Sequence, residues 1–213
     1  MSGQGLRLFV EAVLSMFVII NPIGNLPLLL GMTADLPAGE RRRVLQLAGV
    51  VALGIIWGFA FGGAFLMLHV FHIGLPEFTF GGGLMLVVIG IRNIVLRPQY
   101  QAPAPAGVTP ARLADEEMTL AVSPIAFPLL AGPGSIVTVM LIVNRSGVVF
   151  GALASAAAFV LILAVLRWGD VLLRVLGRVG ALALGRVLQI LIVSIGVHFI
   201  FQAVRDAFLA PKP

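Results

Sequence analysis

Long runs of apolar residues alternate with short polar segments along the whole chain of 213 residues. A helix needs about 20 mainly apolar residues to cross a bilayer, so each long run predicts one membrane-spanning helix. Six spans are expected, over Leu6–Met32, Val44–Val70, Ile73–Leu96, Met118–Val143, Gly147–Leu172 and Leu182–Phe208. The pattern therefore predicts an all-α integral membrane protein.

Proline and glycine interrupt two of these runs. The first run contains "NPIGNLP" at Asn21–Pro27, and the fourth contains "PLLAGPGSI" at Pro128–Ile136. Proline lacks an N–H donor and clashes with the carbonyl four residues earlier, so each motif is expected to break its helix and unwind a turn. Backbone groups freed in hydrocarbon must be satisfied by protein or by a water-filled cavity. Both breaks should therefore face the protein interior.

The two halves of the chain match when the sequence is shifted by 106 residues. The shift aligns the prolines of the two breaks and two similar segments of the third spans, namely Pro22 with Pro128, Pro27 with Pro133, and Val87–Gly90 with Val193–Gly196. Each half holds three spans, an odd number, so the halves must insert in opposite orientations. This predicts two inverted three-helix repeats, a build typical of secondary transporters.

A polar segment rich in proline and alanine separates the halves. We expect a first three-helix repeat over residues 1–97, a cytoplasmic linker over 98–117 and a second repeat over 118–213, which together form one transmembrane domain. The linker is the only substantial polar insert, and its composition is typical of an extended connection.

Composition and charge support a membrane location. Charged residues make up only 11% of the chain, whereas a soluble domain has about 25%. The net charge of +5 does not indicate nucleic-acid binding, because the arginines lie at the ends of apolar runs, as topogenic charges do. Of these basic residues, nine lie on the side of the first, third and fifth loops and four on the side of the termini. Both termini are therefore expected to be extracytoplasmic.

The chemistry of the two breaks suits a small zwitterion. A half-helix that starts at a break presents N–H groups and a positive dipole end, which favour a carboxylate. The carbonyls that end the preceding half-helix suit an ammonium group or a cation. Asn21, Asn25 and Ser135 add neutral donors and acceptors at the same depth, and Gly134 is expected to leave space for a ligand beside the backbone. Two breaks related by an in-plane two-fold axis would meet near the membrane midplane.

These two motifs, six spans and a central hydrophilic segment resemble the MarC family of bacterial and archaeal inner-membrane proteins over essentially the whole chain. The family is similar to the small-neutral-amino-acid transporter SnatA and is grouped with LysE-type amino-acid exporters. The resemblance implies a multi-pass protein of the cell inner membrane with a substrate site at the motifs. Its residues would be Asn21, Pro22, Gly24, Asn25, Pro27, Pro128, Gly132, Pro133, Gly134 and Ser135.

The shift also pairs two acidic residues, Glu11 and Glu117. Each precedes its break by about ten residues, or roughly 15 Å of helix, and so cannot contact a ligand held there. One interpretation is a gate or proton site at each mouth of the protein. The other is a carboxylate in the first turn of a helix, where the helix dipole favours it. Both interpretations stay open at this point.

The sequence thus predicts a secondary transporter for small neutral amino acids such as glycine or alanine, coupled to Na⁺ or H⁺. The substrate would bind at the midplane between the two broken helices. The alternatives are an exporter of another amino acid or small metabolite, and a membrane assembly subunit that transports nothing. The expected partners are a small-molecule substrate and the lipid bilayer, without nucleic acid.

An enzyme is not expected. The chain has no cysteine, and its three histidines form no recognised metal spacing, so neither a metal site nor a catalytic residue is predicted. Ser135 is the best candidate nucleophile, but it does not lie in a GxSxG motif. No cofactor is expected beyond the coupling ion.

Overall fold

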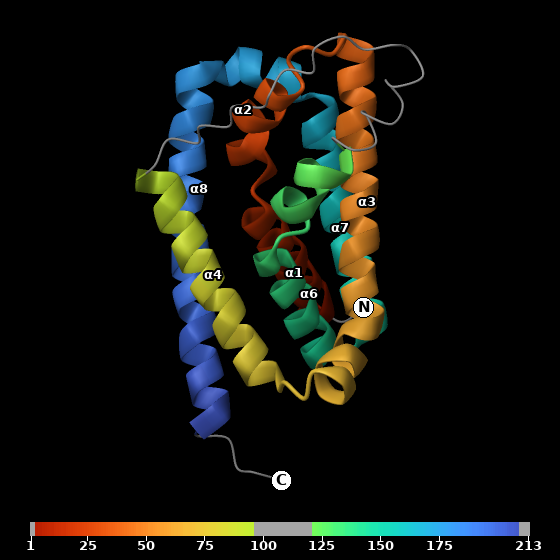
Figure 1. Ribbon diagram of the computed structural model, residues 1–213, viewed down its shortest axis with the longest axis vertical. Coiled ribbons are helices and arrows are strands. Elements are labelled where there is room, and N and C mark those ends of the chain that lie inside the picture. Colours follow the sequence, from red (N-terminus) through yellow and green to blue (C-terminus); the bar gives the residue numbers. More distant parts are fainter. Residues whose placement is uncertain (1–2, 96–120, 209–213) are drawn as a thin grey trace.

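The computed structural model describes residues 3–95 and 121–208, and every regular element within them is a helix (Figure 1). The expected linker over 98–117 and Glu117 lie outside the described residues. In chain order the helices are α1 (Gly3–Ile20), α2 (Pro22–Met32), α3 (Ala38–Phe65), η1 (Leu66–Val70), α4 (Leu75–Val95), η2 (Ala121–Leu130), α6 (Pro133–Ser146), α7 (Val148–Arg167) and α8 (Gly169–Phe208). The elements η1 and η2 are wound as π-helix.

Within the described residues, five helical segments are long and apolar enough to cross a membrane. The pair η2 and α6, bent by 58°, adds a sixth when it is counted as one span. The five segments cover Gly3–Met32, Ala38–Val70, Leu75–Arg92, Val148–Arg167 and Ala183–Phe208, so each expected span corresponds to one of them or to the bent pair. The prediction of an all-helical, multi-pass membrane protein is confirmed.

One boundary differs from the sequence prediction. The fifth and sixth spans were expected to be separated by a segment between Leu172 and Leu182, but α8 already begins at Gly169. Its first turns run across the upper end of the molecule in Figure 1 before the helix turns downward. The bend lies at Gly177, where φ is +66°, a conformation that glycine adopts at little cost.

The main core lies among α1, α2, α3, η2, α6 and α7. Two hydrogen bonds between polar side chains and the neighbouring helix join α3 to α7 across this core. The Gln46 side chain donates to the Leu163 carbonyl at 2.8 Å, and Trp57 Nε1 donates to Ser155 Oγ at 3.2 Å. Because little water competes for such bonds inside a bilayer, α3 and α7 form a fixed frame beside the two breaks.

A second helix pair, α4 and α8, packs side by side at one flank of this core (Figure 1). Its contact is built on small residues. A Cβ atom on Gly83 would lie 2.7 Å from the Gly196 carbonyl oxygen, and one on Gly196 would lie 2.8 Å from the Gly83 carbonyl oxygen. Glycine at both positions therefore lets the two backbones touch, as is common between membrane helices.

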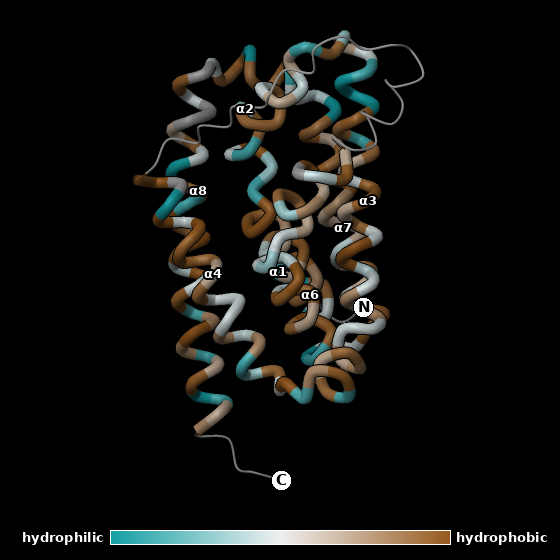
Figure 2. Tube along the Cα trace, in the orientation of Figure 1, coloured by the Kyte–Doolittle hydropathy of each residue, from teal (hydrophilic) through white to brown (hydrophobic). Residues whose placement is uncertain are grey.

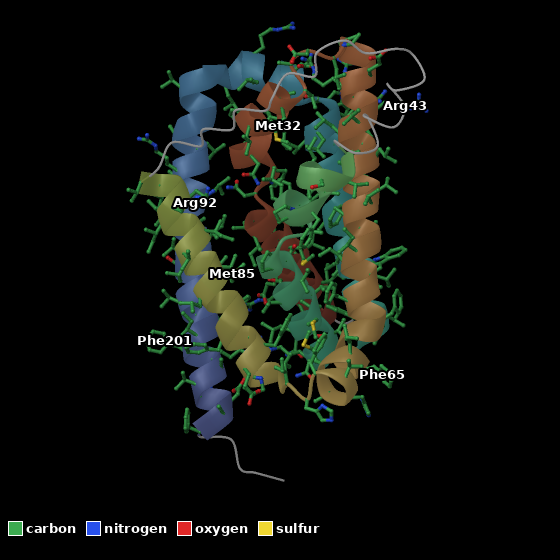
Figure 3. All side chains as sticks on the ribbon, viewed as in Figure 1. Met32, Arg43, Phe65, Met85, Arg92 and Phe201 are labelled. Atoms are coloured by element: carbon green, nitrogen blue, oxygen red, sulfur yellow. The ribbon has the colours of Figure 1, made fainter. Side chains whose placement is uncertain are left out.

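The outer surface of the bundle is largely apolar. Figure 2 shows hydrophobic residues along most of the helices and hydrophilic residues gathering at the upper end around the start of α3. Phe65 and Phe201 point away from the bundle in Figure 3 and are 64% and 71% exposed. Side chains of this kind favour a hydrocarbon environment over water. At the upper end, Arg41 of α3 forms an ion pair of 3.0 Å with Asp170 at the start of α8.

Candidate functional site

The first break lies at a single residue, Asn21, between α1 and α2. Asn21 has φ 51° and ψ 53°, the left-handed conformation, and Pro22 begins α2 directly afterwards. A residue before proline is disfavoured in the right-handed helical region, and asparagine is among the few residues other than glycine that adopt the left-handed one. The dipeptide Asn-Pro therefore ends one helix and starts the next without any intervening loop.

Side chains satisfy the backbone groups that this break frees. The Asn21 side-chain oxygen accepts a hydrogen bond from the Gly24 N–H at 3.0 Å, which caps α2. The Asn25 side chain donates to the Ile20 carbonyl at 3.0 Å, at the end of α1. The expected unwinding of a turn is wrong for this motif. Pro27 remains inside α2, because the cap at Asn21 restarts the helix before it.

The second break is wider and more strongly bent. The chain leaves helical geometry at Ser123 and Phe127, and η2 ends at Leu130. Gly132 is extended, with φ −81° and ψ 173°, and α6 starts at Pro133. The two parts meet at 58°. At this motif, the prediction of a helix opened over several residues agrees with the structure.

Ser135 satisfies the carbonyls at the second break. Its hydroxyl lies 2.9 Å from the Gly132 carbonyl oxygen and 3.2 Å from that of Leu130, and it donates its proton to this pair. Ser135 is only 2% exposed, so an unbonded hydroxyl there would be costly. The cap position of α6 is a glycine, which has no side chain to cover the first N–H groups of the helix.

The two breaks lie against each other. Ile19, in the last turn of α1, has its Cγ2 atom 3.1 Å from the position that a Cβ on Gly134 would take. Gly134 is in the first turn of α6, so the end of α1 touches the start of α6. The space expected beside Gly134 is not open: Leu86 of α4 and Ile19 fill it, and a Cβ atom would clash with Leu86. The structure differs from the sequence prediction here because Leu86 and Ile19, which are distant from Gly134 in sequence, pack against it.

One polar group at the breaks has no partner. Asn21 is 1% exposed, and within the described chain its side-chain Nδ2 donates to no acceptor. The neighbouring helix α8 covers this region, because Gly185 packs against the backbone of Gly24, with its Cβ position 3.1 Å from the Gly24 Cα. The breaks therefore carry one buried hydrogen-bond donor, Asn21 Nδ2, that a ligand could engage.

The structure brings most of the predicted site residues to these two junctions. Buried among them are Asn21, Pro22, Gly134 and Ser135, and partly buried are Gly24, Asn25, Pro27, Gly132 and Pro133. Pro128 is exposed. Glu11 lies on the outside of α1, where its side chain is 54% exposed and pairs with Arg7 at 2.9 Å. A carboxylate with this partner and exposure makes no contact with either break.

Residues that the sequence analysis did not single out also shape the site. Leu86 packs on Gly134 and belongs, with Ile19 and Ile192, to a small buried cluster between the breaks, α4 and α8. Leu86 and Ile192 are one 106-residue shift apart and are both buried, at 5% and 4% exposure. The repeat register is therefore a sequence signal that could have indicated them.

Comparisons with known proteins cover almost the entire chain. Residues 6–208 match the family described as "MarC family integral membrane protein". A UPF0056 membrane protein of Methanocaldococcus jannaschii is 31% identical over 208 residues, covering 96% of this chain and 99% of that protein. One from Aquifex aeolicus is 32% identical, with 93% of each chain covered. The inner membrane protein MarC of Salmonella typhimurium is 29% identical, covering 87% of this chain and 89% of its own. No solved structure matches the chain.

Proposed function

The chain belongs to the MarC family of integral membrane proteins, and we propose that it is a secondary transporter for small neutral amino acids of the glycine and alanine class. The observation that carries the proposal is the contact between the two helix breaks in the protein interior. Ile19, two residues before Asn21, packs on Gly134 in the uncapped first turn of α6. The first break, which carries the unpartnered Asn21 Nδ2, therefore lies beside the start of α6, and each break adds the carbonyl end of a helix.

A zwitterion matches these groups. Its carboxylate suits the Asn21 Nδ2 donor and the positive end of α6, which begins without a side-chain cap. Its ammonium group suits carbonyl oxygens such as those of Ile20 and Leu130. Each of these oxygens accepts from a side chain and keeps a second lone pair. Ile19 and Leu86 crowd the region, which favours a substrate with a small side chain.

Substrate access requires movement of α4 and α8 relative to the breaks. Leu86 of α4 covers Gly134, and Gly185 of α8 covers Gly24. Two side-chain hydrogen bonds join α3 to α7, and the Arg41–Asp170 ion pair ties the first turn of α8 to α3 before the bend at Gly177. We propose that α4 and the part of α8 after Gly177 separate from the breaks while the α3 and α7 frame stays in place.

The packing supports an inverted repeat. The 106-residue shift aligns α1 with η2 and α3 with α7. If the halves are equivalent, a contact of α1 with α7 implies a contact of η2 with α3, and both pairs pack together. The same equivalence relates the contact of Gly90 with Val193 to that of Gly196 with Val87, and both are present. We propose on this basis that the halves are related by a two-fold axis in the membrane plane, as in many transporters that alternate access around a fixed site.

The orientation follows from the basic residues and is also a proposal. With more arginine on the side of the first, third and fifth loops, both termini face outward. A reporter that is active only in the cytoplasm should stay silent when fused after Pro213 and give a signal when inserted within residues 98–117. The reverse pattern would invert the orientation.

The function is tested by uptake into proteoliposomes. The purified full chain should take up glycine and alanine faster than empty vesicles, and an imposed Na⁺ or proton gradient should drive accumulation. Lysine and glutamate serve as charged controls and should not compete. Uptake of a different metabolite with no effect of glycine or alanine would favour the alternative exporter. Silence with every solute tested would favour an assembly subunit.

A further inference from the structure

A polar pocket lies away from the breaks, between the start of α4, the end of α6 and the end of α8. It has a volume of about 250 Å³, the liquid volume of about eight water molecules. Six polar residues line it, namely Thr79, Asn144, Arg145, Gln202, Arg205 and Asp206. The pocket therefore has room for a small amino acid and carries groups of both charges.

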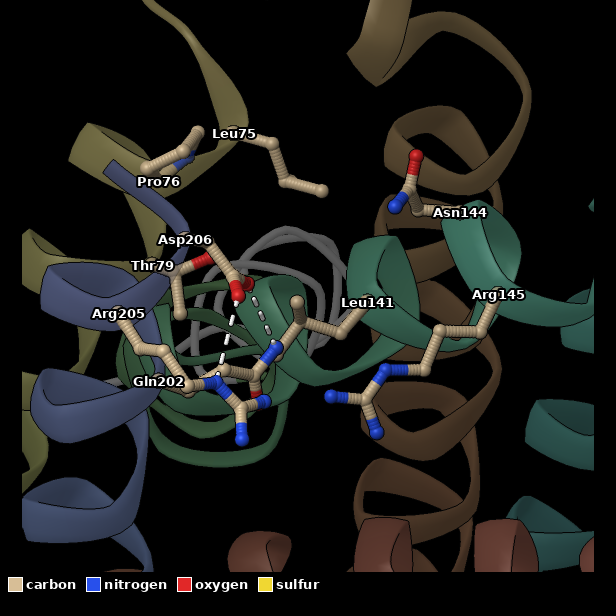
Figure 4. A pocket seen from close by; sticks show the side chains of 9 residues that line it. All are labelled: Leu75, Pro76, Thr79, Leu141, Asn144, Arg145, Gln202, Arg205 and Asp206. Carbon is tan, nitrogen blue, oxygen red and sulfur yellow. Dashed lines mark hydrogen bonds and ion pairs between the residues drawn. The ribbon is translucent and has the colours of Figure 1, made fainter. Parts of the chain in front are cut away.

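The charged groups stand on two sides. Figure 4 shows Thr79, Gln202, Arg205 and Asp206 gathered on one side of the pocket and Asn144 and Arg145 on the other, with the Arg145 guanidinium reaching inward. Asp206 lies 3.8 Å from Arg205 and 3.5 Å from the Gln202 amide nitrogen, both long contacts. Within the described residues, Arg145 makes no ion pair. One guanidinium and one carboxylate thus face the same space without a close partner.

A buried hydroxyl also opens onto this space. Thr79 is only 2% exposed, and its Oγ1 has no hydrogen-bond partner within the described chain. A buried hydroxyl is normally hydrogen-bonded, so this one is suited to a ligand or a water molecule in the pocket. Thr79, Arg145 and Asp206 come from three different helices, which makes the arrangement a property of the folded bundle.

We infer that this pocket is an outer binding site for the zwitterion of a small α-amino acid, in front of the breaks. This inference rests on the proposed transport function. The substrate carboxylate would lie on Arg145, since a guanidinium matches a carboxylate with two parallel hydrogen bonds. The substrate ammonium would lie between Asp206 and the Thr79 hydroxyl. Arg145 is twelve residues after Pro133, or roughly 18 Å along α6, so the pocket is separate from the breaks.

The location fits an entrance. The pocket lies at the end of the bundle that carries the η1–α4 and α6–α7 connections and the end of α8, which is the side proposed to face outward. At the equivalent place in the other half, the register aligns Thr79 with Gly185, which packs closely on Gly24. The end of the bundle at Thr79 therefore holds a pocket, whereas the equivalent place at Gly185 is filled by its contact with Gly24.

The test uses the purified full chain in proteoliposomes, with initial rates of alanine uptake measured at increasing alanine concentration. Arg145→Gln should raise the KM at least tenfold while kcat changes less than twofold, and Arg145→Lys should recover part of the affinity. Asp206→Asn should raise the KM as well. The matched control is Arg174→Gln, an exposed arginine in the first turns of α8 at the opposite end, which should leave both parameters unchanged.

The outcomes separate the two proposals. In one outcome the parent chain transports alanine, but both variants, Arg145→Gln and Asp206→Asn, keep the parental KM. The outer site is then wrong, and the proposed transport function stands. If the parent chain transports nothing, the transport function fails, and calorimetric titration of the purified chain with alanine decides on the pocket. If alanine binds the parent chain and Arg145→Gln abolishes that binding, the outer site stands. If alanine does not bind the parent chain, the outer site is wrong. Propionate and ethylamine, each with one of the two charges, should bind more weakly than alanine.

Discussion

The two helix breaks are built from similar sequences but fold differently. In the first, the new helix starts at the first proline of the motif, Pro22, directly after one left-handed residue. In the second, the new helix starts only at the second proline, Pro133, after an extended stretch and with a bend of 58°. The 106-residue register instead aligns Pro133 with Pro27, which lies inside α2.

The residue before the first proline explains this difference. In the first motif it is Asn21, which adopts the left-handed conformation and caps α2 with its side-chain oxygen. The equivalent residue is Phe127, which cannot cap a helix and has φ −128° and ψ 129°, the extended geometry favoured before proline. The chain therefore leaves helical geometry at Phe127, and α6 begins only at Pro133, after the extended Gly132.

The two breaks contribute differently to the site. At the second break, the Ser135 hydroxyl bonds to the backbone, and the wide bend places the start of α6 against the end of α1. At the first break, the Asn21 oxygen and the Asn25 side chain also bond to the backbone, whereas Asn21 Nδ2 has no partner within the described chain. The second break thus sets the geometry, and the first offers the side-chain donor. Variants at each break should accordingly affect stability and transport in different proportions.

The largest expected effect on stability comes from Gly134→Leu. Because a Cβ atom there already clashes with Leu86, the larger side chain should lower the free energy of unfolding by about 3 kcal/mol, the upper end of the usual cost of overpacking. Thermal unfolding of the purified protein and its yield from membranes measure this. Gly58→Leu is the control, because no atom lies within 4 Å of its Cβ position. Equal unfolding temperatures for both variants would contradict the packing described at the second break.

A smaller effect is expected for Ser135→Ala. It removes the hydroxyl that donates to the Gly132 carbonyl, a loss of about 1 kcal/mol for a buried hydrogen bond. Alanine uptake should fall by less than about tenfold, which corresponds to 1.4 kcal/mol, because the start of α6 keeps its place. Ser194→Ala removes a comparable bond to the Ile190 carbonyl at an exposed position and serves as the reference. A complete loss of uptake with unchanged stability would instead make Ser135 a substrate ligand.

The smallest effect is expected for Glu11→Gln. Glu11 pairs with Arg7 on the exposed face of α1, and such pairs four residues apart contribute about 0.3–0.5 kcal/mol. Uptake driven by a proton gradient and by a Na⁺ gradient should both match the parent chain. Selective loss of the proton-driven rate would assign Glu11 the gate or proton role that the sequence left open.

Part of this architecture could be predicted from the sequence. The apolar runs located the spans, and the paired proline motifs located both breaks, because proline acts on the backbone of its own helix. The conformation of each break depends on one neighbour, Asn21 or Phe127, and the shared motif does not distinguish them. The space at Gly134 depends on Leu86, which a third helix brings in, so no local pattern could have indicated it.

The outer pocket illustrates the same limit. Arg145 and Arg205 entered the sequence analysis only in the count of basic residues that predicts the orientation, and Asp206 was not considered there. Their meeting around Thr79 depends on how the ends of α6 and α8 approach the start of α4. The 106-residue shift aligns the buried Leu86 with the buried Ile192, but it aligns Thr79 with Gly185 and Arg145 with Gly39, which are unlike residues, so the repeat gives no sign of the pocket.

The central claim is that Asn21 Nδ2 binds the substrate, and Asn21→Gly tests it most directly. Glycine suits the left-handed conformation, and replacing an asparagine cap by glycine costs only a few tenths of a kcal/mol. With the outer pocket inactivated by Arg145→Gln in both proteins, calorimetric titration with alanine should show at least a tenfold weaker Kd when Asn21→Gly is added, with nearly equal unfolding temperatures. An equal alanine affinity in these two folded proteins would contradict the account.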